Sequence, residues 1–127
     1  MGAFRVRIEL SDSEGERLEA LDALVDTGAT YTWVARSVLQ ELGYTPDEDR
    51  EFILADGRRV LYGLAWVPVR IDGRTRPTPV VFGEEGTEPL LGVVTLEEFG
   101  LGVDAVNRRL VPTPALLKAL RRRHRTG

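Results

Sequence analysis

Apolar and charged side chains alternate along the first part of the chain, and this alternation predicts a β-strand. Residues 3–10 carry an apolar side chain at every second position, with arginine or glutamate between them, which is typical of a strand that buries one face. Short alternating, β-branched or aromatic segments predict further strands at residues 31–34, 51–54, 59–71, 75–82, 101–104 and 109–112. Pro77 and Pro79 interrupt one of these strands, and because proline donates no ladder hydrogen bond we expect that strand at a sheet edge.

The segment before Asp26 allows two interpretations. Residues 16–24 can be arranged as a helix, but the apolar residues gather directly before Asp26. That finish favours a strand over residues 18–25, buried toward its end and paired with residues 3–10 in a hairpin. Asp-Gly pairs at 56–57 and 72–73 stand between apolar runs and predict two further hairpins, and residues 45–50 read as a charged loop.

Helices are few and short in this pattern. Residues 35–42 and 95–99 predict helices that end at Gly43 and Gly100, and residues 114–123 predict a terminal helix. Many short strands with so few helices predict a small, mostly-β, barrel-like domain over residues 1–112. A basic helix or tail over residues 113–127 completes the chain.

Composition limits the chemistry that the protein can perform. The 127 residues are 43% hydrophobic and 29% charged, which is typical of one globular domain. The chain has no cysteine, and its one histidine, His124, lies in the basic tail. Disulfides, thiol catalysis and cysteine–zinc sites are excluded, and histidine triads or multi-histidine metal sites are not expected. We therefore expect no metal and no other cofactor.

Charge and hydropathy bear on the binding partners and the cellular location of the protein. The net charge of −3 gives no reason to expect binding to nucleic acid or anionic membrane. No apolar run reaches the roughly 18–20 residues that span a bilayer, and the N-terminus lacks a signal-peptide pattern, so we expect a cytoplasmic protein without a transmembrane segment. Residues 115–125 carry five positive charges and no acid. Such a tail either binds anionic lipid or nucleic acid, or is a solvated helix end.

Asp26 is the most conspicuous candidate for chemistry. Apolar residues lead into this acid, and Gly28 follows it closely, which predicts a buried strand that ends in a tight turn. The local pattern is compatible with two roles for Asp26. Its carboxylate caps the turn or a following helix, or it serves as a functional acid at the mouth of the strand.

Four segments in order carry a resemblance to a known family. They are Ala23-Leu24-Val25-Asp26-Thr27-Gly28-Ala29-Thr30, the hairpin from Asp56 to Gly63, Pro89-Leu90-Leu91-Gly92, and the closing pattern over residues 96–111. Together they resemble the retropepsin-like (retroviral-type) aspartic proteases, including their single-domain bacterial members. The resemblance covers residues 4–111 and implies a closed, barrel-like acid-protease fold.

The resemblance also implies an activity, an aspartic endopeptidase acting on peptide or protein substrates. The chain holds one Asp-Thr-Gly, whereas pepsin-like enzymes with two lobes carry two, so a homodimer must bring together Asp26 from each subunit. Without cysteine or a usable histidine, carboxylates are the plausible acid and base. By resemblance, Thr27 bonds across the two-fold axis, Gly28 and Ala29 complete the loop, and Gly92 braces it from behind.

The same resemblance assigns a flap that closes over the substrate. Its residues are Ala55, Asp56, Gly57, Arg58 and Gly63. This tip has fewer glycines than retroviral flaps, and its two arginines, Arg58 and Arg59, either favour acidic substrates or keep the hairpin soluble. The retroviral Gly-Arg pair is here Gly92-Val93.

Two alternatives remain from the sequence. The first is a dimeric peptide-binding or scaffold module that keeps the protease fold without turnover, although an intact Asp-Thr-Gly argues against it. The second is another small β domain in which Asp26 is a lone carboxylate, for example a metal ligand. For Trp33 and Trp66, packing in the core or a dimer contact is a simpler role than reading substrate.

Overall fold

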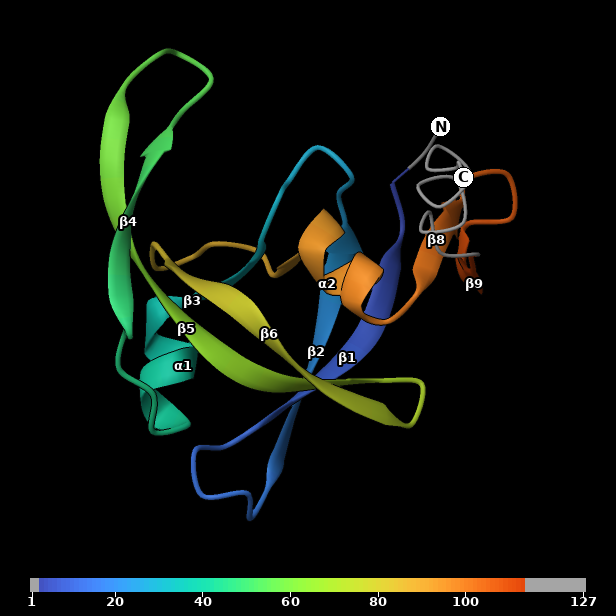
Figure 1. Ribbon diagram of the computed structural model, residues 1–127, viewed down its shortest axis with the longest axis horizontal. Helices are drawn as coiled ribbons and strands as arrows, with labels where there is room; N and C mark the ends of the chain where they lie inside the picture. The colour runs from blue at the N-terminus through green and yellow to red at the C-terminus, as the bar shows by residue number, and fades with distance from the viewer. Residues whose placement is uncertain (1–2, 114–127) are drawn as a thin grey trace, which may run out of the picture.

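The computed structural model describes residues 3–113, and these residues form nine strands and two short helices (Figure 1). In chain order the elements are β1 (Arg5–Ser11), β2 (Leu18–Val25), β3 (Thr32–Ala35), α1 (Arg36–Glu41), β4 (Glu48–Ile53), β5 (Arg59–Ile71), β6 (Arg74–Gly83), β7 (Leu90–Leu91), α2 (Val93–Glu98), β8 (Leu101–Asp104) and β9 (Arg109–Pro112). The predicted terminal helix over 114–123 lies outside the described residues. The 18–25 segment is a strand, as its apolar finish indicated.

Strand pairing closes most of the sheet into a ring. Seven strands follow the order β1-β2-β7-β3-β6-β5-β4, and β1 pairs in addition with β5 through Glu9 with Arg70 and Leu10 with Val69. The ladder therefore returns to its starting strand, which confirms the predicted closed, barrel-like fold. β4 stands outside the ring and pairs only with the first half of β5. The strands β8 and β9 form a separate two-stranded sheet.

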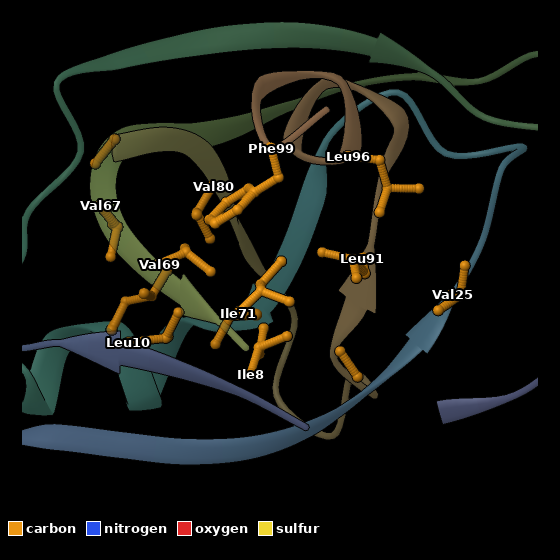
Figure 2. Packing of buried hydrophobic residues seen from close by; sticks show 14 of the residues in the cluster. Ile8, Leu10, Val25, Val67, Val69, Ile71, Val80, Leu91, Leu96 and Phe99 are labelled. Carbon is orange, nitrogen blue, oxygen red and sulfur yellow. The ribbon is translucent and has the colours of Figure 1, made fainter. Parts of the chain in front are cut away.

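The inward faces of the ring form the hydrophobic core. Ile8 and Leu10 of β1 meet Val67, Val69 and Ile71 of β5, and each is at most 3% exposed (Figure 2). These residues recur at every second position, as the pleat of a strand requires. Burying an aliphatic side chain of this size stabilises a fold by roughly 1.5–3 kcal/mol relative to leaving it exposed.

Both Asp-Gly pairs form the hairpin turns that were predicted for them. Asp72 and Gly73 have φ angles of 56° and 83°, the left-handed pair that a two-residue hairpin loop needs. At the other turn, Gly57 has φ of 89°, and the Leu54 N–H donates to the Arg58 carbonyl oxygen at 2.8 Å. The hairpin of β4 and β5 projects well beyond the barrel (Figure 1, upper left).

The prediction of a charged loop over residues 45–50 is wrong in its second half. Strand β4 begins at Glu48, and the pairing runs from Glu48 opposite Leu64 to Ile53 opposite Arg59. All but one of its residues are exposed. Because Phe52 is its one partly buried residue, the sequence of this strand lacks the alternation that marks a half-buried strand.

The prediction of an edge position is wrong for β6 as a whole and holds only for the half that carries the prolines. β6 lies between β3 and β5 in the sheet. However, β3 pairs only with the last four residues of β6, from Val80 to Gly83. Pro77 and Pro79 precede that stretch and have β5 as their one neighbour, so the missing donors are tolerated.

An aromatic cluster joins the projecting hairpin to β3. Trp33 lies 5.3 Å from Phe52 and 5.0 Å from Tyr62 between ring centroids, and Tyr31 lies 6.1 Å from Phe52. The tilted and edge-on geometries are those that aromatic pairs prefer. Trp33 therefore packs against both strands of the hairpin, whereas Trp66 is 53% exposed. None of the helices within residues 3–113 has the length and apolar content needed to cross a membrane.

The core placement gives a first testable prediction. Ile8→Ala removes a fully buried side chain, so we expect a loss of about 2–5 kcal/mol in the free energy of unfolding. Ile53→Ala at the projecting hairpin, where the side chain is 64% exposed, is the matched control and should change it by less than about 0.5 kcal/mol. Urea unfolding monitored by circular dichroism measures both. Equal effects of the two substitutions would contradict the barrel placement.

Candidate active-site loop

The position of Asp26 is set by strands that pair on both sides of the turn. β2 runs parallel to β7, with Leu24 opposite Leu90 and Val25 opposite Leu91. Directly beyond this pairing, the Asp26 N–H donates to the Leu91 carbonyl oxygen at 3.1 Å. The Asp26 carbonyl oxygen in turn accepts from the Ala29 N–H at 3.0 Å and closes the turn. Asp26 therefore stands at the end of a buried strand, as the sequence predicts.

The Asp26 carboxylate is held by the turn that it begins. Its Oδ1 accepts a hydrogen bond from the Gly28 N–H at 2.9 Å. A side chain on residue 28 would place its Cβ 3.2 Å from the same oxygen, so glycine leaves the carboxylate room. Asp26 is half-buried, whereas Thr27 and Gly28 are exposed. Within residues 3–113 Asp26 enters no ion pair, and Oδ2 accepts no hydrogen bond from these residues. Capping the turn and presenting a carboxylate are thus compatible roles.

Gly92 fits against the back of this loop too closely for any other residue. An added Cβ would lie 2.4 Å from the Tyr31 carbonyl oxygen and 3.0 Å from that of Ala29. The next two residues hold the loop as well, because the Val93 N–H donates to Ala29 and the Val94 N–H to the carbonyl oxygen of Thr30, each at 2.9 Å. The structure therefore brings together Asp26, Gly28, Ala29 and Gly92, four of the residues that the resemblance assigns to this loop.

Three threonines behind the loop were missed by the sequence analysis. Thr32, Thr78 and Thr95 come from β3, β6 and α2, and each is 0% exposed. Their hydroxyls form a chain, with Thr95 Oγ1 2.7 Å from Thr32 Oγ1 and 2.8 Å from Thr78 Oγ1. The Gly92 N–H donates to Thr32 Oγ1 at 3.1 Å and connects this chain to the loop. The one available signal was that Thr32 shares its face of β3 with buried Val34.

The predicted flap tip lies at the end of the projecting hairpin. Ala55, Asp56, Gly57 and Arg58 are all exposed there. Asp56 accepts from the Arg58 backbone N–H at 3.0 Å and from Arg58 Nε at 2.9 Å, and these bonds hold the pKa of the Asp56 carboxyl below its usual value. Within residues 3–113, no hydrogen bond or ion pair joins this tip to the Asp26 loop.

Gly63, also predicted as a flap residue, lies at the base of the hairpin and not at its tip. It pairs with Asp49 of β4. A Cβ at this position would lie 2.5 Å from Pro46 Cγ and 3.6 Å from Phe82 Cδ1. Close packing against the Pro46 ring is therefore the physical reason for glycine here.

One hollow of the surface, about 760 Å³, lies between β1, the β5–β6 turn and the β8–β9 sheet, and none of the predicted site residues lines it. Another hollow, about 260 Å³, is lined by Tyr31 and Val94, which flank the Asp26 loop, and by Arg50 and Trp66. Among residues 3–113, no three acidic or histidine side chains are grouped so that they could hold a metal ion.

The tight seat of Gly92 predicts a specific sensitivity. Gly92→Ala should lower the free energy of unfolding by about 1–3 kcal/mol, because the new methyl group meets backbone atoms that cannot swing away. Gly102→Ala is the control, since its Cβ would lie an ordinary 3.4 Å from Thr113, and it should stay within about 0.5 kcal/mol of the wild type. Urea unfolding measures both. If Gly92→Ala unfolds with the wild-type free energy, Gly92 does not brace the Asp26 loop.

A double-mutant cycle tests the role of Gly63. Gly63→Ala should cost about 1–3 kcal/mol through its clash with the Pro46 ring. In a Pro46→Ala background the ring is gone, and the same substitution should cost clearly less, which gives a coupling energy above about 0.5 kcal/mol. Thermal and urea unfolding of the four proteins provide the cycle. Additive effects would mean that Gly63 is required for another reason, such as contact with a ligand.

The chain matches known proteins at the level of family and of fold. Residues 7–95 match the family model described as aspartyl protease, a stretch that includes Asp26 and Gly92. The solution structure of simian foamy virus (mac) protease is similar, with a TM-score of 0.55 and 18% sequence identity over 75% of this chain and 93% of that one. No curated protein matches the sequence significantly. Because the match spans more than half of the 127 residues, the chain belongs to the aspartyl protease family, and its fold is retropepsin-like.

Proposed function

We propose that the protein is a homodimeric aspartic endopeptidase that hydrolyses peptide bonds with a water molecule activated by Asp26 of both subunits. The observation that carries the proposal is the Asp26 carboxylate itself. It is half-buried at the end of a strand, one oxygen is held by the Gly28 N–H, and the other accepts no hydrogen bond within residues 3–113. This arrangement, in a chain of the aspartyl protease family, presents one half of an acid pair.

The second half of the pair has to come from another copy of the chain. Only one Asp-Thr-Gly occurs in the sequence. A two-fold axis beside the loop brings the same surface of each subunit together, so a single aspartate per chain yields two in the dimer. Thr27 and Gly28 are exposed next to Asp26, as residues at such an axis must be before the subunits meet.

The chemistry follows from placing two carboxyl groups side by side. Two adjacent carboxylates cannot both ionise easily, so the pair shares one proton, as in other aspartic proteases. The ionised carboxylate takes a proton from the water molecule, and the water oxygen bonds to the carbon of the scissile carbonyl group. At the same time the protonated carboxyl group gives its proton to the oxygen of that carbonyl group. The carboxyl group that took the proton from water then gives it to the amine nitrogen as the carbon–nitrogen bond breaks, and a hydroxyl of the intermediate returns a proton to the other carboxylate. No metal or other cofactor takes part in this scheme.

The β4–β5 hairpin is proposed as the flap that covers an extended peptide. It projects beyond the barrel, its two strands are held against β3 by the aromatic cluster, and its tip is exposed, so the tip is available to a bound substrate (Figure 1). Closure of such a hairpin excludes water from the reacting groups. Arg58 is engaged by Asp56 in the tip, which fits a role in shaping the turn as well as in attracting acidic substrates. A cytoplasmic location stays a prediction from the sequence.

Replacing Asp26 by asparagine tests the proposal. The amide of the Asp26→Asn variant keeps an oxygen for the Gly28 N–H, so the turn should persist, but the pair loses its acid and base. We expect peptide cleavage to fall by at least about 10²–10⁴-fold, with the dimer retained by light scattering. The control is Asp12→Asn, because Asp12 also caps a turn, accepting from the Glu16 N–H at 2.7 Å, but lies in the β1–β2 loop. It should remain active.

Mixing wild-type and Asp26→Asn subunits tests whether the site is shared. After equal mixing and exchange, about half of the wild-type subunits have a variant partner, so activity per wild-type subunit should fall to about half. Unchanged activity per wild-type subunit would show that each chain acts alone. A stable dimer that cleaves nothing in a broad peptide library from pH 3 to 8 would favour a binding or scaffold module instead.

A further inference from the structure

We infer that the Thr95 hydroxyl is a positioning group for the proposed catalytic loop, acting on Asp26 through Thr32 and the β7–α2 junction. The inference rests on the proposed function and adds a residue that does not touch substrate. Thr95 is 0% exposed on α2, behind the loop, so any effect on catalysis has to pass through its neighbours.

The three buried hydroxyls of Thr32, Thr78 and Thr95 are unusual in the otherwise apolar interior that residues 3–113 form. A buried hydroxyl is destabilising unless it is hydrogen-bonded, and valine would fill nearly the same space without that requirement. Here the Thr95 hydroxyl forms hydrogen bonds with both neighbouring hydroxyls, and its Oγ1 lies 2.7 Å from that of Thr32 and 2.8 Å from that of Thr78. Each threonine belongs to a different element, so the hydroxyl chain fixes α2 against two strands of the barrel by directional bonds, which apolar packing does not supply.

The chain of bonds continues from Thr95 to both sides of Asp26. Thr32 Oγ1 accepts from the Gly92 N–H at 3.1 Å. One residue before Gly92, the Leu91 carbonyl oxygen holds the Asp26 N–H, and one residue after it, the Val93 N–H holds the Ala29 carbonyl oxygen. A displacement at Gly92 therefore shifts the start and the end of the turn together.

Gly92 cannot absorb such a displacement without moving its neighbours. The space where its Cβ would be is already occupied by Tyr31 backbone atoms at 2.4 and 2.5 Å. In the proposed dimer the two carboxyl groups have to lie within hydrogen-bond distance of each other in order to share one proton. Small errors in the position of reacting groups are costly, and a shift of about 1 Å can lower a rate by 10²-fold.

Two substitutions separate the hydroxyl from the rest of the side chain. Thr95→Val keeps the size and removes the hydroxyl, and Thr95→Ser keeps the hydroxyl and removes the methyl group. We expect Thr95→Val to lower kcat by about 10- to 10²-fold with KM changed less than about twofold, and to narrow the bell-shaped pH profile of kcat/KM. Thr95→Ser should keep the wild-type kcat and profile width. The control is Val69→Ala, which leaves a cavity at a fully buried position of β5 and so lowers stability without touching the hydroxyl chain.

The outcomes distinguish this inference from the proposed function. If Thr95→Val loses stability as Val69→Ala does but keeps the wild-type kcat and pH profile, Thr95 is a structural residue and the inference is wrong. If the wild type shows no cleavage that Asp26→Asn removes, the proposed function fails instead. In that case carbon-13 NMR titration of the Asp26 carboxyl group still tests positioning. Thr95→Val should change that titration curve and Thr95→Ser should not, and identical curves in all three proteins would overturn the inference.

Discussion

A two-residue strand carries the architecture around Asp26. β7 consists of Leu90 and Leu91 and lies between β2 and β3, pairing parallel with one and antiparallel with the other. Its partners lie more than fifty residues earlier in the chain, so this closure depends on contacts that form only when the whole barrel assembles. Loop closure over such distances makes folding slow compared with local pairing. The candidate site is therefore a product of the complete fold and not of a local motif.

The interior around that strand combines two kinds of interaction with different tasks. Aliphatic residues of β1, β5 and β6 supply non-directional stabilisation in proportion to the apolar area that they bury. The threonine chain contributes little net stability, because each hydroxyl exchanges hydrogen bonds with water for hydrogen bonds within the protein. Its contribution is orientation. The polar links lie behind the Asp26 loop, where small displacements matter most to the proposed chemistry, and the aliphatic packing fills the rest of the barrel.

Local chemistry explains which features the sequence could predict. The Asp-Gly turns and the strand before Asp26 follow from residue types whose backbone preferences are strong. The place of Gly92 behind the loop came only from the family resemblance, because its tight contact with Tyr31 appears only in the fold. The start of β4 was predicted at residue 51 and not at Glu48, because a strand with one partly buried residue has no apolar alternation to detect. Thr95 could not be found because its partners, Thr32 and Thr78, are 63 and 17 residues away and only the fold brings them together. The contact between Gly63 and Pro46 is hidden for the same reason.

The aromatic cluster makes the hairpin observable by optical spectroscopy. Trp33 packs on Phe52 and Tyr62, which lie on the two strands of the hairpin, whereas the indole of Trp66 is largely in water. Movement of the hairpin relative to β3 would change the polarity around the Trp33 indole. Trp66 lies on β5 and lines a hollow together with Arg50 of β4, so its emission also responds to the hairpin. With only two tryptophans in the chain, the emission of the unlabelled protein therefore reports on the hairpin. Any opening and closing of the β4–β5 hairpin, the proposed flap, can thus be followed in real time without attaching a dye.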